Sequence, residues 1–251
     1  MSTISTERDG AILRITLNRP EKLNALDTPT LTELHRRLTE AADDSSVRVV
    51  ALTGAGRAFS SGGDLSGKNT KGAVRAANLV VSTITRLPKP VVAGVHGPAV
   101  GLGCPLALAC DLVVAKRSAY FQLAFARVGL MLDGGASVLL PRAIGRARAA
   151  RMAMTAEKVS AATAFDWVLV SHVVDDTAYE AELAAVTSAL AAGPTQSFRW
   201  IKRAFAAATL SHLETVQAID EEGQRMLVQS NDYRRGVEAF RAGRQPQFAG
   251  D

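Results

Sequence analysis

The stretch Gly97-Pro98-Ala99-Val100-Gly101-Leu102-Gly103-Cys104-Pro105 organises the fold expected for this chain. It follows an apolar run, residues 91–95, that is typical of a buried strand, and it leads into an alanine- and leucine-rich segment that is typical of a buried helix. A strand, a glycine turn and a helix start leave backbone N–H groups without partners. Such groups can bind an anion, or an oxygen that becomes negative during a reaction. Many α/β proteins carry a turn of this kind for packing alone, so the turn by itself predicts no function.

The length and composition predict a soluble globular protein with a substantial core. The chain has 251 residues, of which 47% are hydrophobic and 21% charged, and this fits one large domain or one domain with a helical appendage. The apolar runs are too short to span a membrane and the N-terminus lacks the pattern of a signal peptide, so we expect a cytoplasmic protein. The net charge of +5 is spread along the chain with few aromatic residues, which favours a solvated surface, or a modest site for a phosphorylated small molecule, over nucleic-acid binding.

The cysteines and histidines indicate neither a disulfide nor a metal site. Cys104 and Cys110 are six positions apart in one apolar helical segment, which is more than one turn and less than two, so their side chains point in different directions. We expect two buried, reduced thiols. The four histidines are scattered without the spacing of metal ligands, and we predict that the protein binds no metal.

Strand-like and helix-like segments alternate to about residue 175, and helices follow. Residues 11–17 are expected to form a strand in a hairpin that turns at Asp9-Gly10. Thr28 as N-cap and Pro29 at the first helical position then predict a helix. Further strands are expected at 47–53 and 112–115, and the chain reads as mostly helical from residue 137 onward. This order predicts an α/β fold with right-handed crossovers and a helical C-terminal part.

A second glycine turn in the sequence helps to interpret the first. Ser61-Gly62-Gly63-Asp64 also follows an expected strand, and together with the loop at 18–26 the two turns resemble the enoyl-CoA hydratase/isomerase (crotonase) family. The resemblance covers nearly the whole chain, because the order and spacing of further segments fit it as well. These segments are residues 129–135, 140–149, 160–174 and 236–248.

This resemblance implies a fold and an assembly. The fold would be a spiral ββα core over residues 1–195, followed by a C-terminal helical region over residues 196–251 that completes a homotrimer, often paired into a hexamer. The resemblance also implies an acyl-CoA thioester as ligand. CoA is then part of the substrate, and no separate cofactor, nucleic acid or membrane is expected as a partner.

The resemblance further assigns roles to individual residues. The backbone N–H groups of Gly63 and Leu102 would form an oxyanion hole for the thioester oxygen as it becomes an enolate, a task that needs backbone donors rather than particular side chains. Lys22 is expected near the CoA phosphates, although a solvated loop lysine fits it equally well. The segment from Lys68 to Arg86 is expected to line the acyl pocket. The other residues expected to contact substrate are Ala25, Ser61, Gly62, Asp64, Leu65, Phe125 and Leu132.

Two positions depart from the family pattern. Hydration in this family is usually assigned to two glutamates, and the motifs place these positions at Pro105 and Phe125. Neither residue can transfer a proton. Proline suits the first turn of a helix, where a missing N–H costs little, so the turn at Gly101–Gly103 can keep its shape without the acid.

One carboxyl remains near the expected site. Asp133 could be an N-cap for a helix that starts near residue 136, or a base in the acyl pocket that removes a proton beside the thioester and returns it elsewhere. The second interpretation predicts double-bond isomerisation. Burial among apolar side chains, those of Phe121, Phe125, Leu130 and Leu132, would raise the pKa of Asp133 into a useful range. Asp64 is a rival base that fits better as a brace for its loop. The alternatives to isomerisation are a non-catalytic acyl-CoA-binding protein and a hydratase that uses Asp133 alone.

Overall fold

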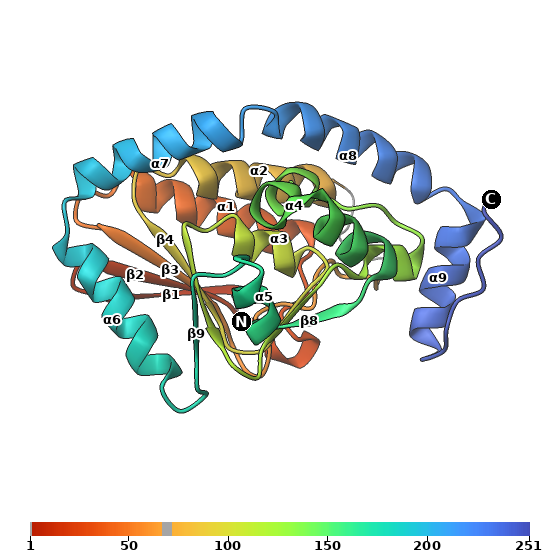
Figure 1. The fold of residues 1–251 in the computed structure, drawn as a ribbon, viewed down its shortest axis with the longest axis horizontal. Helices are drawn as coiled ribbons and strands as arrows, with labels where there is room; N and C mark the ends of the chain where they lie inside the picture. Colours follow the sequence, from red (N-terminus) through yellow and green to blue (C-terminus); the bar gives the residue numbers. More distant parts are fainter. Residues whose placement is uncertain (1, 67–71) are drawn as a thin grey trace.

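A six-stranded sheet forms the centre of the computed structural model, which describes residues 2–66 and 72–251 (Figure 1). Its strands lie in the order β1-β2-β3-β4-β6-β9, and all neighbours are parallel except the hairpin of β1 and β2. The hairpin was predicted to turn at Asp9-Gly10, but Asp9 still pairs with Ile12, so the turn residues are Gly10 and Ala11. The strands are β1 (Ile4–Asp9), β2 (Ile12–Leu17), β3 (Val49–Gly54), β4 (Val91–Val95), β6 (Leu112–Lys116) and β9 (His172–Val174).

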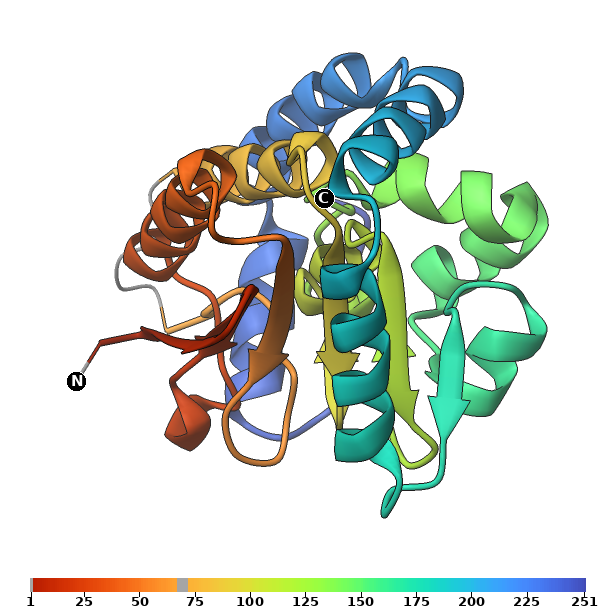
Figure 2. The same cartoon turned by 90° about the vertical axis from the view of Figure 1, so that its left-hand side faces the viewer.

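Helices cover both faces of this sheet because its middle strands are apolar on both sides. Every residue of β4 is buried, which is the pattern of a parallel strand covered on two faces. Helix α6 (Tyr179–Ala192) contacts β2, β3 and β6, and Figure 2 shows it crossing one face of the sheet. Helices α1 (Thr28–Asp43) and α2 (Ala73–Arg86) pack against each other over the core. The part of the predicted acyl-pocket segment at residues 68–71 lies outside the described residues.

Helix α1 begins one residue earlier than the capping pattern predicted. Its N-cap is Asp27, whose carboxylate accepts hydrogen bonds from the backbone N–H of Thr30 at 3.0 Å and from its hydroxyl at 2.6 Å. Thr28 is therefore the first helical residue and not the cap. A carboxylate binds an unpaired helix N–H at least as well as a hydroxyl, so the cap falls to Asp27.

A second, three-stranded sheet carries the glycine turn of the opening stretch. Strand β5 (Pro98–Val100) pairs in parallel with β7 (Tyr120–Gln122), which pairs antiparallel with β8 (Lys158–Ser160). Along the chain, α3 (Gly103–Leu108) follows β5, and the short helix η2 (Ala124–Val128) follows β7. The chain beyond residue 137 is less uniformly helical than predicted. It forms α4 (Ala136–Thr155), then β8, α5 (Ala161–Asp166) and β9, and the three-residue strands are too short to show the alternation that identifies a strand.

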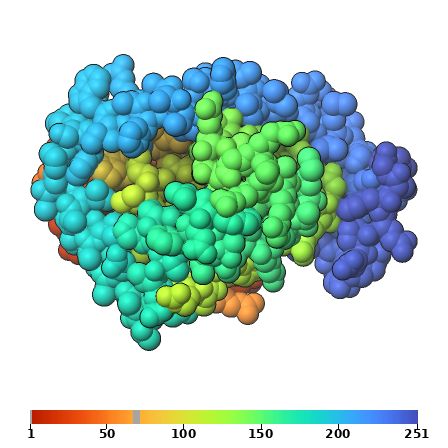
Figure 3. All heavy atoms as spheres, viewed as in Figure 1, coloured from red at the N-terminus to blue at the C-terminus, as the bar shows by residue number. Residues whose placement is uncertain are grey.

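The C-terminal helices run along one side of the molecule and past its end. Helices α7 (Thr195–Thr209) and α8 (Leu213–Leu227) both contact α2, and α8 also contacts α4. Figures 1 and 3 show α9 (Asn231–Arg241) projecting at the end opposite α6. Helix α9 packs closely on η2, since a Cβ added to Gly236 would lie 2.6 Å from the backbone of Val128. Helix α7 begins at Thr195, so the expected boundary between residues 195 and 196 falls after its first residue.

Two further expectations concern side chains and membranes. Cys104 and Cys110 are both buried and free, as the sequence predicted. Burial raises the pKa of both thiols, that of Cys104 to about 12, so neither is a reactive thiolate at neutral pH. Within residues 2–66 and 72–251, none of the helices has the length and apolar character needed to cross a membrane.

Candidate functional site

The two glycine turns predicted from the sequence lie side by side. Ser60 pairs with Ala99 of β5 in a parallel bridge. The backbone N–H of Ser60 donates to the carbonyl of Pro98 at 3.0 Å, and the N–H of Val100 donates to the carbonyl of Ser60 at 2.9 Å. These bonds hold the loop after β3 against the strand that leads into the Gly101–Gly103 turn. Segments 40 residues apart in the chain therefore form one structure.

Gly62 is the point of closest approach between the turns. A Cβ at this position would lie 2.7 Å from the carbonyl oxygen of Val100 and 3.1 Å from the amide nitrogen of Leu102, and the φ of Gly62 is +91°. Only glycine fits both the contact and the backbone conformation without strain. The amide of Leu102 is thus brought next to the Gly62-Gly63 segment.

Gly63 and Leu102 supply two unpaired backbone donors. Within the described part of the chain, neither amide donates a hydrogen bond. Gly63 is exposed, and a Cβ built on it would meet nothing within 4 Å. Leu102 stands at the N-terminal end of α3, where amides have no helical partner. Two adjacent N–H groups beside open space are the arrangement that stabilises a developing oxyanion.

Pro105 leaves this turn intact. The first hydrogen bond of α3 runs from the N–H of Leu106 to the carbonyl of Leu102 at 3.1 Å. Because the helical bonds begin after Pro105, its missing N–H removes none of them. The expectation that proline preserves the turn is confirmed. Phe125, at the other position expected to hold a glutamate, is buried in η2.

Asp133 lies beside the turn and does not cap a helix. Helix α4 begins at Ala136 with Gly135 as its N-cap and no side-chain capping bond, so the N-cap interpretation of Asp133 is wrong. A left-handed backbone at Gly134 and Gly135 separates Asp133 from the helix start. A Cβ on Gly134 would lie 2.6 Å from Cδ1 of Leu102 and 3.4 Å from Cγ of Pro105, so the Asp133-Gly134 loop packs on the turn at Gly101–Gly103 and on the start of α3.

The carboxyl of Asp133 is suited to exchange a proton near neutral pH. Its residue is 8% exposed. The pKa of Asp133 is raised to about 7, because burial and, to a smaller extent, the neighbouring Asp220 raise it while a hydrogen bond from Gln224 lowers it. Oδ2 accepts that bond from Nε2 of Gln224 at 3.3 Å, whereas Oδ1 is buried without a partner. A group with a pKa near the working pH can both accept and return a proton.

Helix α8 contributes a polar face that the sequence analysis missed. Its buried residues are Leu213, Gln217, Asp220 and Gln224. Their spacing of three and four positions places them on one face of the helix. Three polar side chains buried on one helix face are unusual, and such a face is a sign of a functional site. The signal was missed because only a tertiary contact shows that this face is buried.

Asp64 is a brace and not a proton carrier. Its Oδ2 lies 3.0 Å from a guanidinium nitrogen of Arg19 and 3.4 Å from Nζ of Lys22, and its Oδ1 accepts the N–H of Ser66 at 2.9 Å. Although burial acts in the opposite direction, these hydrogen bonds hold the pKa of Asp64 far below its ordinary value. The carboxylate stays ionised and ties the loop at 60–66 to the loop at 18–26.

The other residues expected to contact substrate surround this brace. Arg19 also donates to the carbonyl of Ala25 at 2.7 Å, and the N–H of Ser61 donates to the carbonyl of Leu23 at 2.8 Å. Arg241 of α9 donates to the carbonyl of Leu65 at 3.0 Å, which adds a cation that the sequence did not single out. Leu132 is partly buried and directly precedes Asp133. The structure thus brings Lys22, Ala25, Ser61, Asp64 and Leu65 to one edge of the two turns.

The family model for enoyl-CoA hydratase/isomerase matches residues 7–251. This chain belongs to the enoyl-CoA hydratase/isomerase family. The 1,2-epoxyphenylacetyl-CoA isomerase of Escherichia coli (strain K12) is 38% identical over 260 residues, which cover 100% of this chain and 99% of the relative. The structural match to this crotonase family is equally extensive.

Two solved structures illustrate that match. The enoyl-CoA hydratase from Mycobacterium avium subsp. paratuberculosis K-10 has a TM-score of 0.95 and 40% identity, and the match covers 99% of both chains. A monofunctional enoyl CoA isomerase from M. smegmatis has a TM-score of 0.73 and 35% identity over 82% of this chain and 93% of that one. The predicted family and the crotonase fold are confirmed, while both hydratases and isomerases occur among these relatives.

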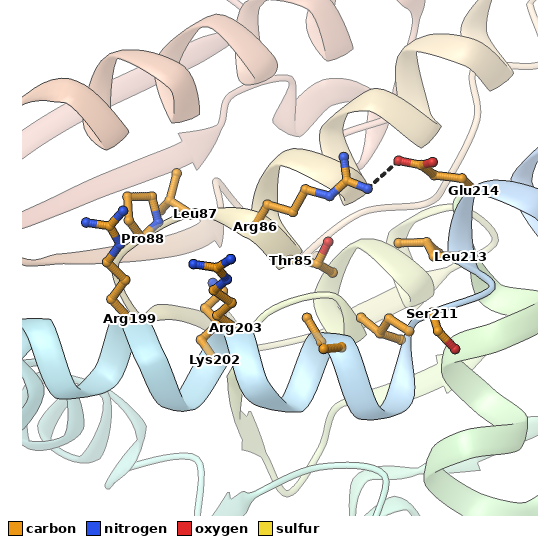
Figure 4. A pocket seen from close by; sticks show the side chains of 13 residues that line it. Thr85, Arg86, Leu87, Pro88, Arg199, Lys202, Arg203, Ser211, Leu213 and Glu214 are labelled. Atoms are coloured by element: carbon orange, nitrogen blue, oxygen red, sulfur yellow. Dashed lines mark hydrogen bonds and ion pairs between the residues drawn. The ribbon is translucent and has the colours of Figure 1, made fainter.

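A cavity of about 680 Å³ lies apart from the two turns, between the end of α2 and helices α7 and α8 (Figure 4). Arg199, Lys202 and Arg203 reach into it from α7, and Arg86 pairs with Glu214 across it. Lys202 is already bound to Asp111 at 2.7 Å. Thr85 and Arg86, at the end of the segment expected to line the acyl pocket, line this cavity, but none of the residues individually expected in catalysis or substrate contact does, so the two turns remain the candidate site.

Proposed function

We propose that the protein isomerises the double bond of an enoyl-CoA thioester. In this proposal the amides of Gly63 and Leu102 bind the thioester oxygen, and Asp133 removes a proton from the carbon beside the thioester. The electron pair of that C–H bond moves into the conjugated enolate. The same carboxyl then returns its proton to the far carbon of the original double bond, which leaves the double bond next to the thioester, so no proton is gained or lost overall.

The observation that carries the proposal is a single buried carboxyl packed against an oxyanion turn. Oδ1 of Asp133 has no partner and its pKa is raised to about 7, whereas Asp64 is held ionised by its loop. Pro105 and Phe125 stand where the family's hydratases are expected to carry glutamates, so no second acid is available at those positions to activate water. One carboxyl that works first as base and then as acid is sufficient for isomerisation.

The names of the relatives support this choice without excluding hydration. The M. smegmatis structure is described as an enoyl CoA isomerase, the E. coli relative as an isomerase of an epoxide, 1,2-epoxyphenylacetyl-CoA, and the M. avium structure as a hydratase. A hydratase that recruits water through Asp133 alone is therefore the second candidate. A non-catalytic acyl-CoA-binding protein is the third, because an oxyanion hole can bind a thioester without turning it over.

The CoA moiety is proposed to lie along the edge braced by Asp64. Lys22 and Arg241 lie at this edge together with Arg19, whose guanidinium is already paired with Asp27 and Asp64. The phosphates of CoA would pair with Lys22 and Arg241. Ala25, Ser61, Gly62, Asp64 and Leu65 would then flank CoA through backbone and loop contacts, while Phe125 and Leu132 would face the acyl chain.

A 3-enoyl-CoA and a 2-enoyl-CoA substrate together separate the three candidates. From the 3-enoyl-CoA we expect the conjugated 2-enoyl-CoA with no change in mass, which is read by ultraviolet absorbance and mass spectrometry. Water adds only to the conjugated double bond, so a product of the 2-enoyl-CoA that is heavier by one water would favour the hydratase. Binding of acyl-CoA by calorimetry, with no conversion across a panel of chain lengths, would contradict catalysis altogether.

We also propose that the chain forms a homotrimer through its C-terminal helices. Ile201 and Phe205 on α7 are 49% and 67% exposed and lie four positions apart on one helix face, and large apolar side chains that are exposed together favour an interface. Sedimentation equilibrium is expected to give three times the 26.5 kDa of one chain, or six times if trimers pair. The Phe205→Glu variant should lower that mass. A wild-type protein that sediments as a single chain would contradict the assembly.

A further inference from the structure

A second carboxyl is buried behind Asp133. Asp220 of α8 is 0% exposed. The hydroxyl of Ser137, in the first turn of α4, donates to its Oδ1 at 2.9 Å, and its Oδ2 is buried without a partner. Because the site described above uses only Asp133, the structure leaves this carboxyl without a role in binding or in the reaction steps.

Gln224 connects the same helix to the loop of Asp133. Its Nε2 donates to the carbonyl of Met131 at 2.7 Å and to Oδ2 of Asp133 at 3.3 Å. Gln224 follows Asp220 by four positions and therefore lies on the same face of α8. One helix thus presents to Asp133 both a hydrogen-bond donor and a negative charge.

The surroundings of the two carboxyls contain no countercharge. Helix α2 contributes Asn78 and Ser82, which bond to Gln217 of α8, and α4 contributes the Ser137 hydroxyl. The nearest other acid in this network is Glu221, which is exposed and accepts a bond from Asn78. Among the described residues, no lysine, arginine or histidine forms an ion pair with Asp133 or Asp220. A second negative charge near a buried carboxyl makes its ionisation harder.

We propose that Asp220 and Gln224 are positioning residues for Asp133. Asp220 places a negative charge behind it that strengthens it as a base, and Gln224 holds its Oδ2 so that Oδ1 is left to receive the substrate proton. This inference rests on the proposed function, since it deepens the role of Asp133. Neither residue touches the substrate: the proton moves from the carbon to Oδ1 and back, and Asp220 keeps its own protonation state throughout.

The acid–base behaviour of the pair agrees with this arrangement. Burial raises the pKa of Asp220, while the bond from Ser137 lowers it. The bond from Ser137 to Asp220, at 2.9 Å, is shorter than the 3.3 Å bond from Gln224 to Asp133. Because a hydrogen bond to a carboxylate favours its ionised form, we expect the charge of Asp220 to be present when Asp133 titrates.

The test is the pH dependence of kcat/KM in two variants of α8. For Asp220→Asn we expect the acidic side of the kcat/KM profile (the acid limb), where activity rises as Asp133 ionises, to shift to lower pH by about one unit. The reason is that a like charge near Asp133 has been removed. For Gln224→Leu we expect the acid limb to shift to higher pH, because the bond that favours the ionised form of Asp133 has been lost. Substrate affinity should change little in either variant. Opposite shifts from one helix face are not expected from a general loosening of α8.

A matched control distinguishes the effect of the buried Asp220 charge on the pH profile from the effect of the net charge of α8. Glu222→Gln removes one negative charge from an exposed position two residues after Asp220, and solvent screening should leave the acid limb in place. If Asp220→Asn folds poorly, Ser137→Ala is the second variant. Loss of its hydroxyl keeps Asp220 neutral to a higher pH, and a smaller downward shift is expected. An acid limb that stays fixed in folded Asp220→Asn, or in Ser137→Ala if the former is unfolded, would overturn the proposal.

Infrared titration of the carboxylic acid band distinguishes this inference from the proposed function. The band of Asp133, identified by its loss in Asp133→Asn, is expected to titrate near neutral pH in the wild type and at lower pH in Asp220→Asn. This measurement needs no turnover. A band that shifts as expected in a protein that converts no enoyl-CoA would contradict the proposed function alone, whereas a band that does not shift in an active enzyme would contradict the role of Asp220 alone.

Discussion

The Asp133→Asn variant is expected to lose roughly 10²- to 10⁴-fold in kcat for double-bond isomerisation, the range typical of a lost general base. Asparagine has the same shape and its oxygen can still accept the bond from Gln224, which in the wild type spans 3.3 Å. The amide cannot accept and return the substrate proton. The measurement is initial-rate kinetics with a 3-enoyl-CoA substrate, together with calorimetric binding of an acyl-CoA.

Binding and stability serve as controls for this variant. The dissociation constant of acyl-CoA should be nearly unchanged, because the oxyanion amides and the CoA edge are intact. Stability should not fall either. Since the pKa of Asp133 rises from 3.8 to about 7 on folding, the unfolded chain releases its proton more readily, and this carboxyl weakens the fold as pH rises through that window. The variant should therefore gain stability relative to wild type above pH 7, with the difference vanishing toward pH 4. Turnover equal to that of wild type would exclude Asp133 as the base.

Replacing Leu102 with proline is expected to remove half of the oxyanion hole. The φ of Leu102 is −59°, which proline adopts, and its amide has no hydrogen bond to lose within the described residues. Proline removes the donor and places its ring carbon where the oxyanion would lie. The loss of one such donor lowers kcat by about 10²- to 10³-fold in comparable holes.

Leu102→Ala is the matched control for this change. Both variants delete a side chain that is buried against Gly134, but alanine keeps the backbone N–H. We therefore expect Leu102→Pro to be far slower than Leu102→Ala in the same assay, with similar unfolding midpoints in urea. Equal kcat values for the two variants would show that the Leu102 amide does not bind the oxyanion.

Much of the site could be predicted from sequence because its determinants are local. A glycine turn after an apolar strand can be identified from consecutive residues. The compatibility of Pro105 with a helix start can be judged from its neighbours in the sequence as well. The contact between the two turns was predicted only through the resemblance to a family. It depends on the pairing of Ser60 with Ala99, and loop pairing of this kind has no periodicity to detect.

The features that were missed or misjudged are those decided by tertiary contacts. Whether Asp133 caps a helix depends on the backbone of Gly134 and Gly135, which turns the carboxyl away from the start of α4. Its environment depends on Asp220 and Gln224, about 90 residues later in the chain. The raised pKa was expected from apolar neighbours, and the direction is right, but a second carboxyl contributes to it. A polar stripe on α8 looks solvated until the helix is seen to pack on α2 and α4.

The position of α8 near the end of the chain has a consequence for synthesis on a ribosome. The two glycine turns proposed to bind the thioester oxygen are complete once residues 60–102 have emerged and paired, whereas Asp220 and Gln224 emerge only with α8. In the proposed mechanism, a nascent or truncated chain would then bind a thioester oxygen before it could move a proton efficiently. Activity should therefore appear late in translation, after most of the central sheet has already formed.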